Sequence, residues 1–322
     1  MVEITIDKNE SDQRLDRFLK KYLANAPQSF IYKMIRKKRI KINNKKANPE
    51  SLIMEGDAIQ LYISDETLEK FIQEKKEIVS SALKGIIYED ENIILINKPK
   101  GVLSHPAEKD YEYNIVDSMV SYLHQKGEYN PRVEKTFVPS ICNRLDRNTS
   151  GIIIGAKNYA TLKEINEAIR RGDIKKYYKC IVKGKVEKDI LLKGYIVKDE
   201  RKNRVKVYKN DVESSKAITT YVKVLKSKDK CSLLEIDLIT GRTHQIRAHL
   251  SSIGHPVIGD TKYGDKSIND FFRKKYDLKS QYLHAYKIVF NGLDSPLNYL
   301  NGREFVANIG TSLERIEKEW FD

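Results

Sequence analysis

The stretch NRLDRNTSG, residues 143–151, places one carboxylate between two guanidinium groups. Asp146 has Arg144 and Arg147 as near neighbours, and three isoleucines at 152–154 follow and predict a buried strand. A carboxylate in this setting can be catalytic, because neighbouring cations keep it ionised. It can equally pair with an arginine at an exposed strand end, where such a pair contributes little stability. The stretch by itself leaves both interpretations open.

Two later stretches also combine polar side chains with strand edges. KKYYKCIVKG, residues 175–184, contains Tyr177 and Tyr178, which point to opposite faces if the strand is regular. LITGRTHQIRAHLSSIGHPVIGDTKYG, residues 238–264, is rich in arginine and histidine. The candidate chemistry is therefore that of a lone carboxylate, an aromatic ring and an arginine, and their spacing alone indicates a catalytic site only weakly.

Patterns typical of other reaction types are missing. Ser150 precedes a glycine but does not lie in a G-x-S-x-G turn, so a serine hydrolase is not indicated. His244 and His249 are five residues apart, whereas the zinc pattern H-E-x-x-H places its histidines four apart. The three cysteines show no metal-ligand spacing, and neither a P-loop nor G-x-G-x-x-G is present. We therefore expect no metal and no cofactor.

The positive charge of the chain is concentrated near the N-terminus. Lys and Arg number 59 against 45 Asp and Glu, which gives a net charge of +14 and a pI of about 9.3. Eight of the 14 residues at 33–46 (KMIRKKRIKINNKK) are basic and none is acidic. This pattern favours a polyanionic partner such as RNA, although a solvated face or a biased genome composition is the alternative. The predicted RNA-binding residues are Lys33, Arg36, Lys37, Lys38, Arg39 and Lys41.

The basic run lies within a small module that we place at residues 1–64. Apolar residues in RLDRFLKKYL, residues 14–23, share one helical stripe, and GDAIQLYI, residues 56–63, has the pattern of a strand. Residues 65–84 are charged and weakly patterned, so we expect a flexible linker there. A catalytic domain would then occupy residues 85–322.

The second domain has more predicted strands than helices. Two apolar runs around EDEN within 85–101 predict a hairpin, while 114–127 and 158–171 predict helices. Asn114 can cap the first of these helices, and Gly172 is expected to end the second. Many of the later strands follow one another directly. The expected fold class is therefore α+β, with a mixed and largely antiparallel sheet in the catalytic domain and a small N-terminal α/β module.

Three features of the sequence bear on where in the cell the protein is expected. The sequence has no run of about 18 apolar residues that would predict a membrane span, and its start lacks a signal-peptide pattern. Three sparse cysteines suit a reducing environment. We therefore expect a cytoplasmic protein that does not bind a membrane.

The same three stretches carry a resemblance to a known family. NRLDRNTSG resembles the H-R-L-D-x-x-T-S-G motif of the RluA-type pseudouridine synthases, and residues 238–264 are similar to that family's third motif over nearly its whole length. KYYKCIVKG resembles the second motif, and YLHA, residues 282–285, the late Leu-His-Ala strand. The matches follow the family's order over about 85–290. Residues 13–63 resemble the S-four-type (S4) RNA-binding domain that is often fused to these enzymes.

Three positions depart from the family pattern. Asn143 stands where His is usual, which leaves Asp146 in place but alters how its loop can be hydrogen-bonded. Ser280 stands where Arg is common. In the basic module, RKKRIKINNKKA, residues 36–47, lacks the Gly commonly found before the strand, so the turn there is open to question.

The resemblance implies a cofactor-free isomerisation of uridine to pseudouridine in RNA. Asp146 would be the nucleophile, Arg247 would pair with it and keep it ionised despite burial, and Tyr178 would stack on the uracil and abstract the proton from carbon 5. Leu283 would supply an apolar wall of the pocket. The target uridine would have to be flipped out of structured RNA. The other predicted substrate-binding residues are Arg144, Arg147, Arg242, His244 and Gln245.

The identity of the RNA is left open by the resemblance. We expect large-subunit (23S) rRNA, because a basic module tethered by a flexible segment offers a second phosphate anchor at high effective concentration. A tRNA-directed synthase is the alternative. A second alternative is a ribosome-assembly factor that binds RNA without catalytic turnover. This alternative stays open because Asn143 stands where the family usually has His. The sequence indicates no obligate protein partner, and we expect a monomer.

Overall fold

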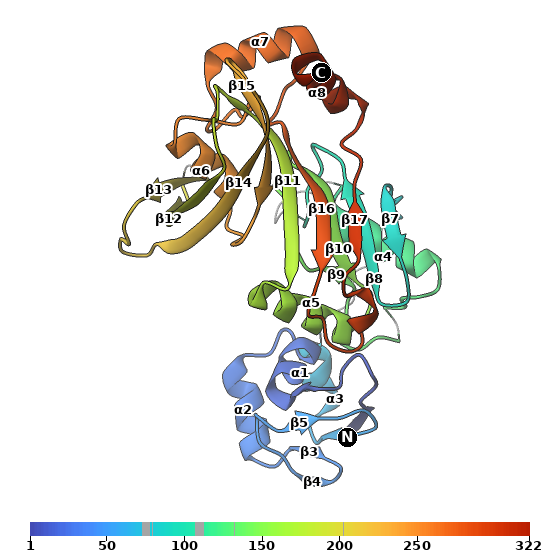
Figure 1. The fold of residues 1–322 in the computed structure, drawn as a ribbon. Coiled ribbons are helices and arrows are strands. Elements are labelled where there is room, and N and C mark those ends of the chain that lie inside the picture. The colour runs from blue at the N-terminus through green and yellow to red at the C-terminus, as the bar shows by residue number, and fades with distance from the viewer. Residues whose placement is uncertain (73–77, 79, 107–112, 132, 202) are drawn as a thin grey trace.

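The computed structural model has a small N-terminal module joined to a larger domain built on one long sheet (Figure 1). It describes residues 1–72, 78, 80–106, 113–131, 133–201 and 203–322. The mixed α+β architecture predicted from the sequence is confirmed. Within the described part of the chain, no helix combines the length and apolar character that crossing a membrane requires.

The N-terminal module packs helices against a short sheet. Helix α1 (Leu15–Tyr22) buries the predicted apolar stripe, including Phe18, and helix α2 (Gln28–Arg36) buries Ile31 and Ile35. The four-stranded sheet has the order β1-β6-β3-β4, and β2 pairs separately with β5. The strands are β1 (Val2–Thr5), β2 (Gln13–Arg14), β3 (Ile40–Ile42), β4 (Lys45–Lys46), β5 (Leu52–Ile53) and β6 (Ala58–Leu61).

The predicted linker contains a helix that belongs to the module. Helix α3 spans Asp65–Phe71, within the range 65–84 for which we expected flexible chain. Leu68 is 3 % exposed in the module's core, and the ring of Phe71 lies 4.7 Å from that of Phe30. Two apolar contacts were enough to fix this short charged helix, which has little periodicity in its sequence. Residues 73–77 and 79 of the predicted linker lie outside the described residues.

The larger domain contains a sheet with the strand order β13-β12-β14-β15-β11-β16-β10-β8-β7, with β17 beside β16 and β9 beside β10. Among the described strands, β10 and β16 pair in parallel and the other pairs are antiparallel, as the sequence predicted. The strands are β7 (Ile86–Glu89), β8 (Ile93–Lys98), β9 (Ser140–Ile141), β10 (Ser150–Ala156), β11 (Ile174–Lys183), β12 (Ile190–Asp199), β13 (Arg204–Tyr208), β14 (Lys216–Lys228), β15 (Cys231–Asp237), β16 (Leu283–Phe290) and β17 (Glu304–Val306).

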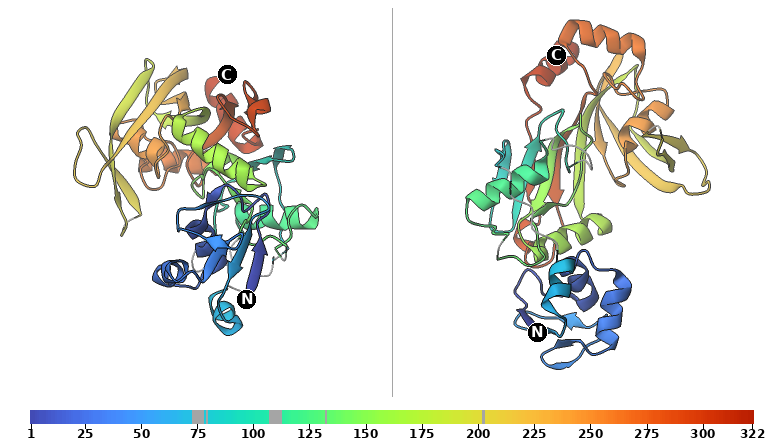
Figure 2. Two further views of the ribbon diagram at one scale, coloured as in Figure 1. Left: turned by 90° about the horizontal axis from the view of Figure 1, so that it is seen from below. Right: turned by 180° about the vertical axis from the view of Figure 1, so that it is seen from behind.

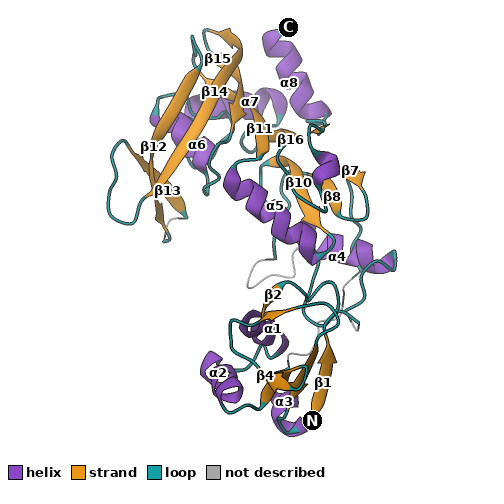
Figure 3. Cartoon of the chain, turned by 60° about the horizontal axis from the view of Figure 1, so that its bottom comes forward, coloured by secondary structure: helices purple, strands orange, loops and turns teal. Residues whose placement is uncertain are grey.

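Helices cover both faces of this sheet, and α7 and α8 lie at the end of the domain farthest from the N-terminal module (Figure 1). The β12–β13 hairpin extends from the edge of the sheet beyond α6 (Figure 3). The helices are α4 (Ile115–Gln125), α5 (Tyr159–Arg171), α6 (Gln245–Ser252), α7 (Lys266–Tyr276) and α8 (Thr311–Phe321), and Asn298–Leu300 form one 3₁₀ turn.

Strand β10 is buried on both faces, as its three isoleucines predicted. Successive side chains of a strand alternate between faces. Ile153 accordingly packs in the core that includes α4, whereas Ile152 and Ile154 pack in the core that includes α5. At the start of the strand Gly151 has a φ of +117°, and a Cβ there would lie 2.2 Å from the carbonyl oxygen of Ala285 on β16. Glycine is therefore required where β10 approaches β16.

The predicted cap at Asn114 and the predicted end of α5 at Gly172 are confirmed. The side chain of Asn114 accepts a hydrogen bond from the N–H of Asp117 at the start of α4, and Asn158 does the same for Thr161 at the start of α5. Gly172 ends α5 in the left-handed conformation with a φ of 84°. Asn158 and Gly172 therefore define where α5 begins and ends.

The N-terminal module docks on the larger domain through polar contacts. Asn9 accepts a hydrogen bond from the backbone N–H of Tyr159 at the start of α5, and Asp12 pairs with Lys163 one turn later. Asp7 pairs with Lys135, whose Nζ lies 2.9 Å from Oδ2. The views of Figure 2 show the module seated beside α5 at one end of the domain. The module is therefore held at a defined place, in contrast to the freely tethered anchor that we expected.

Candidate active site

A cavity of about 560 Å³ opens where the loop before β10 meets strand β11 and the start of α6. This volume is in the range of small-molecule sites in proteins. Its walls come from sequence segments that are far apart, which the sheet order β15-β11-β16-β10 brings side by side. The predicted site residues among those that line it are Asp146, Tyr178, Arg247, Leu283, Arg144, Arg242, His244 and Gln245.

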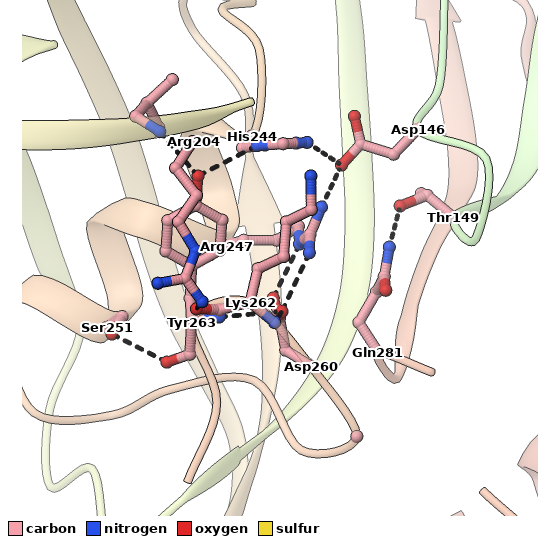
Figure 4. Close-up of polar contacts among 12 residues, drawn as sticks. Asp146, Thr149, Arg204, His244, Arg247, Ser251, Asp260, Lys262, Tyr263 and Gln281 are labelled. Carbon is pink, nitrogen blue, oxygen red and sulfur yellow. Dashed lines mark hydrogen bonds and ion pairs between the residues drawn. The ribbon is translucent and has the colours of Figure 1, made fainter. Parts of the chain in front are cut away.

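Three charged side chains form a chain that ends in the cavity (Figure 4). Nη1 of Arg247 donates to Oδ2 of Asp146 at 2.8 Å, while its Nε and Nη2 donate to the two oxygens of Asp260 at 2.6 and 2.8 Å. The pairing of Asp146 with Arg247 is the one that the resemblance implied. Oδ1 of Asp146 has no hydrogen-bond partner among the described residues, so one oxygen of this carboxylate remains available to a ligand.

Asp260 was missed by the sequence analysis. Its side chain is fully buried and that of Arg247 is 5 % exposed, whereas that of Asp146 is 26 % exposed. Burial raises the pKa of Asp260, but hydrogen bonds and the charge of Arg247 outweigh it and hold this pKa below its ordinary value. Burial opposes the guanidinium as well, yet Asp260 and Asp146 raise the pKa of Arg247. The expectation that Asp146 itself is buried was wrong, because Asp260 takes the buried place.

The loop that carries Asp146 is fixed on both sides of this residue. The hydroxyl of Ser104 donates to the carbonyl of Leu145 at 2.8 Å and accepts from its N–H at 3.1 Å. The ammonium of Lys98 donates to the carbonyl of Arg147 at 2.9 Å and to two carbonyls of its own turn. Burial lowers the pKa of Lys98 to about 7, against the opposing effect of Asp146. Three carbonyl acceptors match the three N–H groups of the protonated form.

The two tyrosines of β11 have different surroundings, as the alternation of a strand predicts. Tyr178 lines the cavity and is 6 % exposed, and burial followed by the charge of Asp146 raises the pKa of its hydroxyl. Tyr177 is only partly buried, and Nζ of Lys287 lies 4.5 Å from the centre of its ring. The pairing of β11 with β16 shifts between these two tyrosines. Tyr178 is thus the tyrosine that the fold brings to Asp146.

His244 approaches the same carboxylate from the other side. Its Nε2 lies 3.9 Å from Oδ2 of Asp146, and its Nδ1 is 2.9 Å from the hydroxyl of Tyr263 (Figure 4). Burial lowers the pKa of His244, against the opposing charge of Asp146. The guanidinium carbon of Arg247 lies 5.2 Å from the ring centre of Tyr263, so this ring supports both neighbours of Asp146.

The other predicted substrate contacts fall into two groups. Leu283 is 3 % exposed and forms part of the cavity wall, and Arg144 and Arg242 are exposed at the cavity. Gln245 is buried, and its amide is hydrogen-bonded to four protein groups of β14 and the preceding turn. Nε of Arg147 donates to the carbonyl of Gly101. Gln245 therefore supports the turn. Arg147 makes a contact within its local loop and is not among the residues that line the cavity.

The side chain of Asn143, which stands where the family usually has His, hydrogen-bonds to the backbone of β10. Its Oδ1 accepts from the N–H of Ile154 at 2.8 Å, and its Nδ2 donates to the carbonyl of Ile152 at 3.2 Å. The amide therefore acts like one residue of a neighbouring strand. This answers the question raised by the sequence, because the substitution leaves the loop of Asp146 attached to β10.

The basic residues of the N-terminal module remain available to a partner. Lys33, Arg36, Lys37, Lys38 and Arg39 are exposed, and Lys41, which is partly buried, lies with its Nζ 5.1 Å from the ring centre of Tyr62. Lys38 adopts a φ of 56° directly after α2, where the sequence lacks the usual Gly. The turn is therefore made with a lysine in the left-handed region. The contact of these side chains with RNA stays a prediction.

An Asp–Arg pair beside a buried Tyr, and an exposed basic module at the N-terminus, match what the resemblance to the pseudouridine synthases implied. A family model described as RNA pseudouridylate synthase matches residues 92–252, and a model of the S4 domain matches residues 13–59. The chain belongs to the RNA pseudouridylate synthase family and is an isomerase with an N-terminal S4 domain, as the sequence motifs indicated.

Relatives match over the whole chain. An uncharacterized RNA pseudouridine synthase of Mycoplasma capricolum is 33% identical over 312 residues, which cover 96% of this chain and 98% of the relative. The ribosomal large subunit pseudouridine synthase C of Vibrio vulnificus is 30% identical and covers 97% of this chain and 94% of its own. The human RNA pseudouridylate synthase domain containing 4 has the same fold, with a TM-score of 0.56 at 23% identity over 72% of this chain and 93% of its own.

Proposed function

We propose that Asp146 is the nucleophile that initiates conversion of a uridine in RNA to pseudouridine. The observation that supports this role is that only one of its two carboxylate oxygens is hydrogen-bonded by a residue that the structure describes. Oδ2 is bound by Arg247 at 2.8 Å, and Oδ1 has no hydrogen-bond partner among the described residues and lies at the cavity. Arg247 is in turn fixed by Asp260, so the carboxylate is held in one orientation beside a guanidinium group before the substrate binds.

The reaction is balanced without a cofactor. The bond between N1 of uracil and C1′ of the ribose breaks, the base turns, and C5 forms a new bond to C1′. One proton leaves C5 and one is gained at N1, so the product is an isomer of the substrate. The enzyme must therefore stabilise a detached base and a reactive sugar and keep both in the cavity while the base rotates.

Tyr178 and Leu283 are suited to hold the base. Both are buried at the cavity, and an aromatic ring facing an aliphatic wall can accept a flat pyrimidine between them. Because the pKa of Tyr178 is raised, its hydroxyl is present as a neutral phenol. It can take the proton from C5 only as it releases its own, and the Asp146 carboxylate, whose charge already acts on it, is the acceptor that we assign to that proton.

The proposed substrate is large-subunit rRNA, and the chain is expected to act as a monomer. Relatives similar over 89% to 97% of this chain are named ribosomal large subunit pseudouridine synthase C. The exposed basic residues of the S4 domain would contact the phosphate backbone, and its docking beside α5 would place those contacts at a constant distance from Asp146. Arg144 and Arg242, which are exposed and line the cavity, would contact the RNA next to the target uridine.

The decisive experiment uses RNA labelled with tritium at C5 of uridine, which releases tritium at each conversion. Purified protein is offered protein-free large-subunit rRNA and bulk tRNA side by side, with Asp146→Asn as the comparison. We expect release from rRNA by the native protein, and none by the variant, which should retain its affinity for RNA. Substantial turnover by Asp146→Asn would contradict the nucleophile, and release from tRNA alone would contradict the substrate.

A further inference from the structure

Three carboxylates meet where the S4 domain docks on the catalytic domain. Asp7 and Glu10 lie in the loop after β1, and Glu134 lies between α4 and β9. One oxygen atom of each lies within 4.8 Å of the other two. The S4 domain therefore supplies two of these carboxylates and the catalytic domain supplies one.

Glu10 is the unusual member of this carboxylate cluster because it is entirely inaccessible to solvent. Its Oε1 accepts hydrogen bonds from the backbone N–H groups of Lys135 and Thr136 at 3.2 and 3.1 Å, so it joins the two domains. Its Oε2 is buried and has no hydrogen-bond partner among the described residues. A buried carboxylate oxygen without a partner costs free energy, so this atom needs either a cation or a proton shared with the carboxyl group of Asp7.

The nearby ammonium groups contact residues other than Glu10. Nζ of Lys135 lies 2.9 Å from Oδ2 of Asp7, and Nζ of Lys21 lies 3.5 Å from the amide oxygen of Gln13. Glu10 forms no ion pair among the described residues. Two carboxyl groups facing each other, those of Asp7 and Glu10, need a cation or a proton between them.

We propose that Asp7, Glu10 and Glu134 bind one hard divalent cation of the Mg²⁺, Mn²⁺ or Ca²⁺ type. The ligand atoms are carboxylate oxygens, which these ions prefer, and no sulfur or imidazole ligand belongs to the cluster. The cation completes the coordination of the buried Oε2 and fastens the S4 domain to the catalytic domain. The sequence contained no metal motif because the three acids become neighbours only when the two domains dock.

The test is isothermal titration calorimetry of the full-length, metal-free protein with MnCl₂ and CaCl₂ at pH 8. We expect one saturable site for each chain, with a Kd below about 1 mM, the weaker end of protein calcium sites. Glu10→Gln keeps an oxygen that can accept from the two backbone N–H groups but removes the charge. This variant should bind at least about tenfold more weakly, as should Glu134→Gln. Electron paramagnetic resonance of Mn²⁺ counts the bound ions independently.

Asp12→Asn is the matched control, because Asp12 lies in the same interface and pairs with Lys163 outside the cluster. It should bind the ions like the native protein. The absence of saturable binding, equal binding by Glu10→Gln, or equal loss in Asp12→Asn would overturn the proposal. If no saturable binding is found, a proton is the occupant, since burial and Asp7 raise the pKa of Glu10 to about 7. Equal binding by Glu10→Gln would place the ion elsewhere, and equal loss in Asp12→Asn would show that the loss is not specific to the three carboxylates. Circular dichroism before titration establishes that every variant is folded.

Discussion

Replacing Asp260 by Asn tests whether Asp146 depends on a partner that it does not touch. In the native structure Arg247 gives two hydrogen bonds to Asp260, at 2.6 and 2.8 Å, and one to Asp146 at 2.8 Å. Asn has one oxygen and no charge, and its amide N–H groups would face the N–H groups of Arg247. Asp146 would then be the only charged partner of the guanidinium among the described residues, and its orientation relative to the cavity would be less firmly fixed.

The size of the effect follows from the interactions that are lost. A hydrogen bond between charged groups contributes about 1.5 to 3 kcal/mol, and breaking one side of a buried ion pair costs about 3 to 5 kcal/mol of folding stability. If one such bond is what orients Arg247 during catalysis, the rate of the chemical step falls about tenfold to hundredfold. Affinity for RNA should change little, because both residues are buried and Asp260 is away from the cavity wall.

The assay is single-turnover release of tritium from C5-labelled RNA with enzyme in excess, which separates the chemical step from binding. Asp265→Asn is the control, because Asp265 caps α7 and pairs with Lys183 outside the cavity. Asn can still cap the helix, so this variant loses only the partly exposed ion pair with Lys183, which should cost less than about 1 kcal/mol of stability with no loss of rate. Turnover by Asp260→Asn at the native rate, in spite of lower thermal stability, would refute the idea that Asp260 positions Arg247 for the reaction.

Three further predictions use the same assay or a direct measure of stability. Tyr178→Phe should bind RNA normally and lose turnover, whereas Tyr177→Phe should be mild; single-turnover rates that reverse this order would move the catalytic role to the other tyrosine. Replacing Lys37 and Lys38 together by Gln should weaken RNA binding and reduce the slope of log K against log salt by up to about 1 for each lost phosphate contact, as measured by fluorescence anisotropy. Gly151→Ala should lower the stability to urea by more than about 2 kcal/mol, because of its φ and its contact with β16.

Matched variants exist for the last two of these. Lys274 and Lys275 lie on α7, at the end of the protein opposite the S4 domain, and their replacement by Gln should leave the salt dependence unchanged (Figure 1). A Cβ added at Gly241 would meet no atom within 4 Å, and its φ is not left-handed, so Gly241→Ala should be nearly neutral for stability. An equal effect of the control and the test variant would contradict the reasoning in either case.

Local patterns predicted much of the fold because local interactions determine it. The caps formed by Asn114 and Asn158 and the left-handed Gly172 fix α4 and α5 through contacts within a few residues, and the sequence displays all of them. The burial of β10 was visible for the same reason. Lys38 shows the limit, because a left-handed lysine is held by the packing of α2 and β3 on either side of it, which no local preference reveals.

The sequence predicted those site residues that lie in distinctive motifs. It did not predict the residues whose role depends on a contact that only the fold creates. Asp146 and Arg247 were identified in this way, and the structure joins them across 101 positions of the chain. Asp260 lies within a motif that we had noted, but its role depends on the hydrogen bonds that it makes to Arg247, which the spacing does not disclose. Gln245 was misassigned as a substrate contact for the converse reason, since only the fold shows that its amide is already occupied.

Helix α5 connects the two places where RNA would be held. Its first residue, Tyr159, meets Asn9 of the S4 domain, and Arg170 in its last turn lines the cavity. Thirteen residues at 1.5 Å each make this helix a stiff spacer of roughly 20 Å. An RNA whose folded shape already presents its phosphates and the target uridine at this separation binds without being deformed, whereas another must bend to fit. We therefore expect the geometry around a uridine to contribute to its selection.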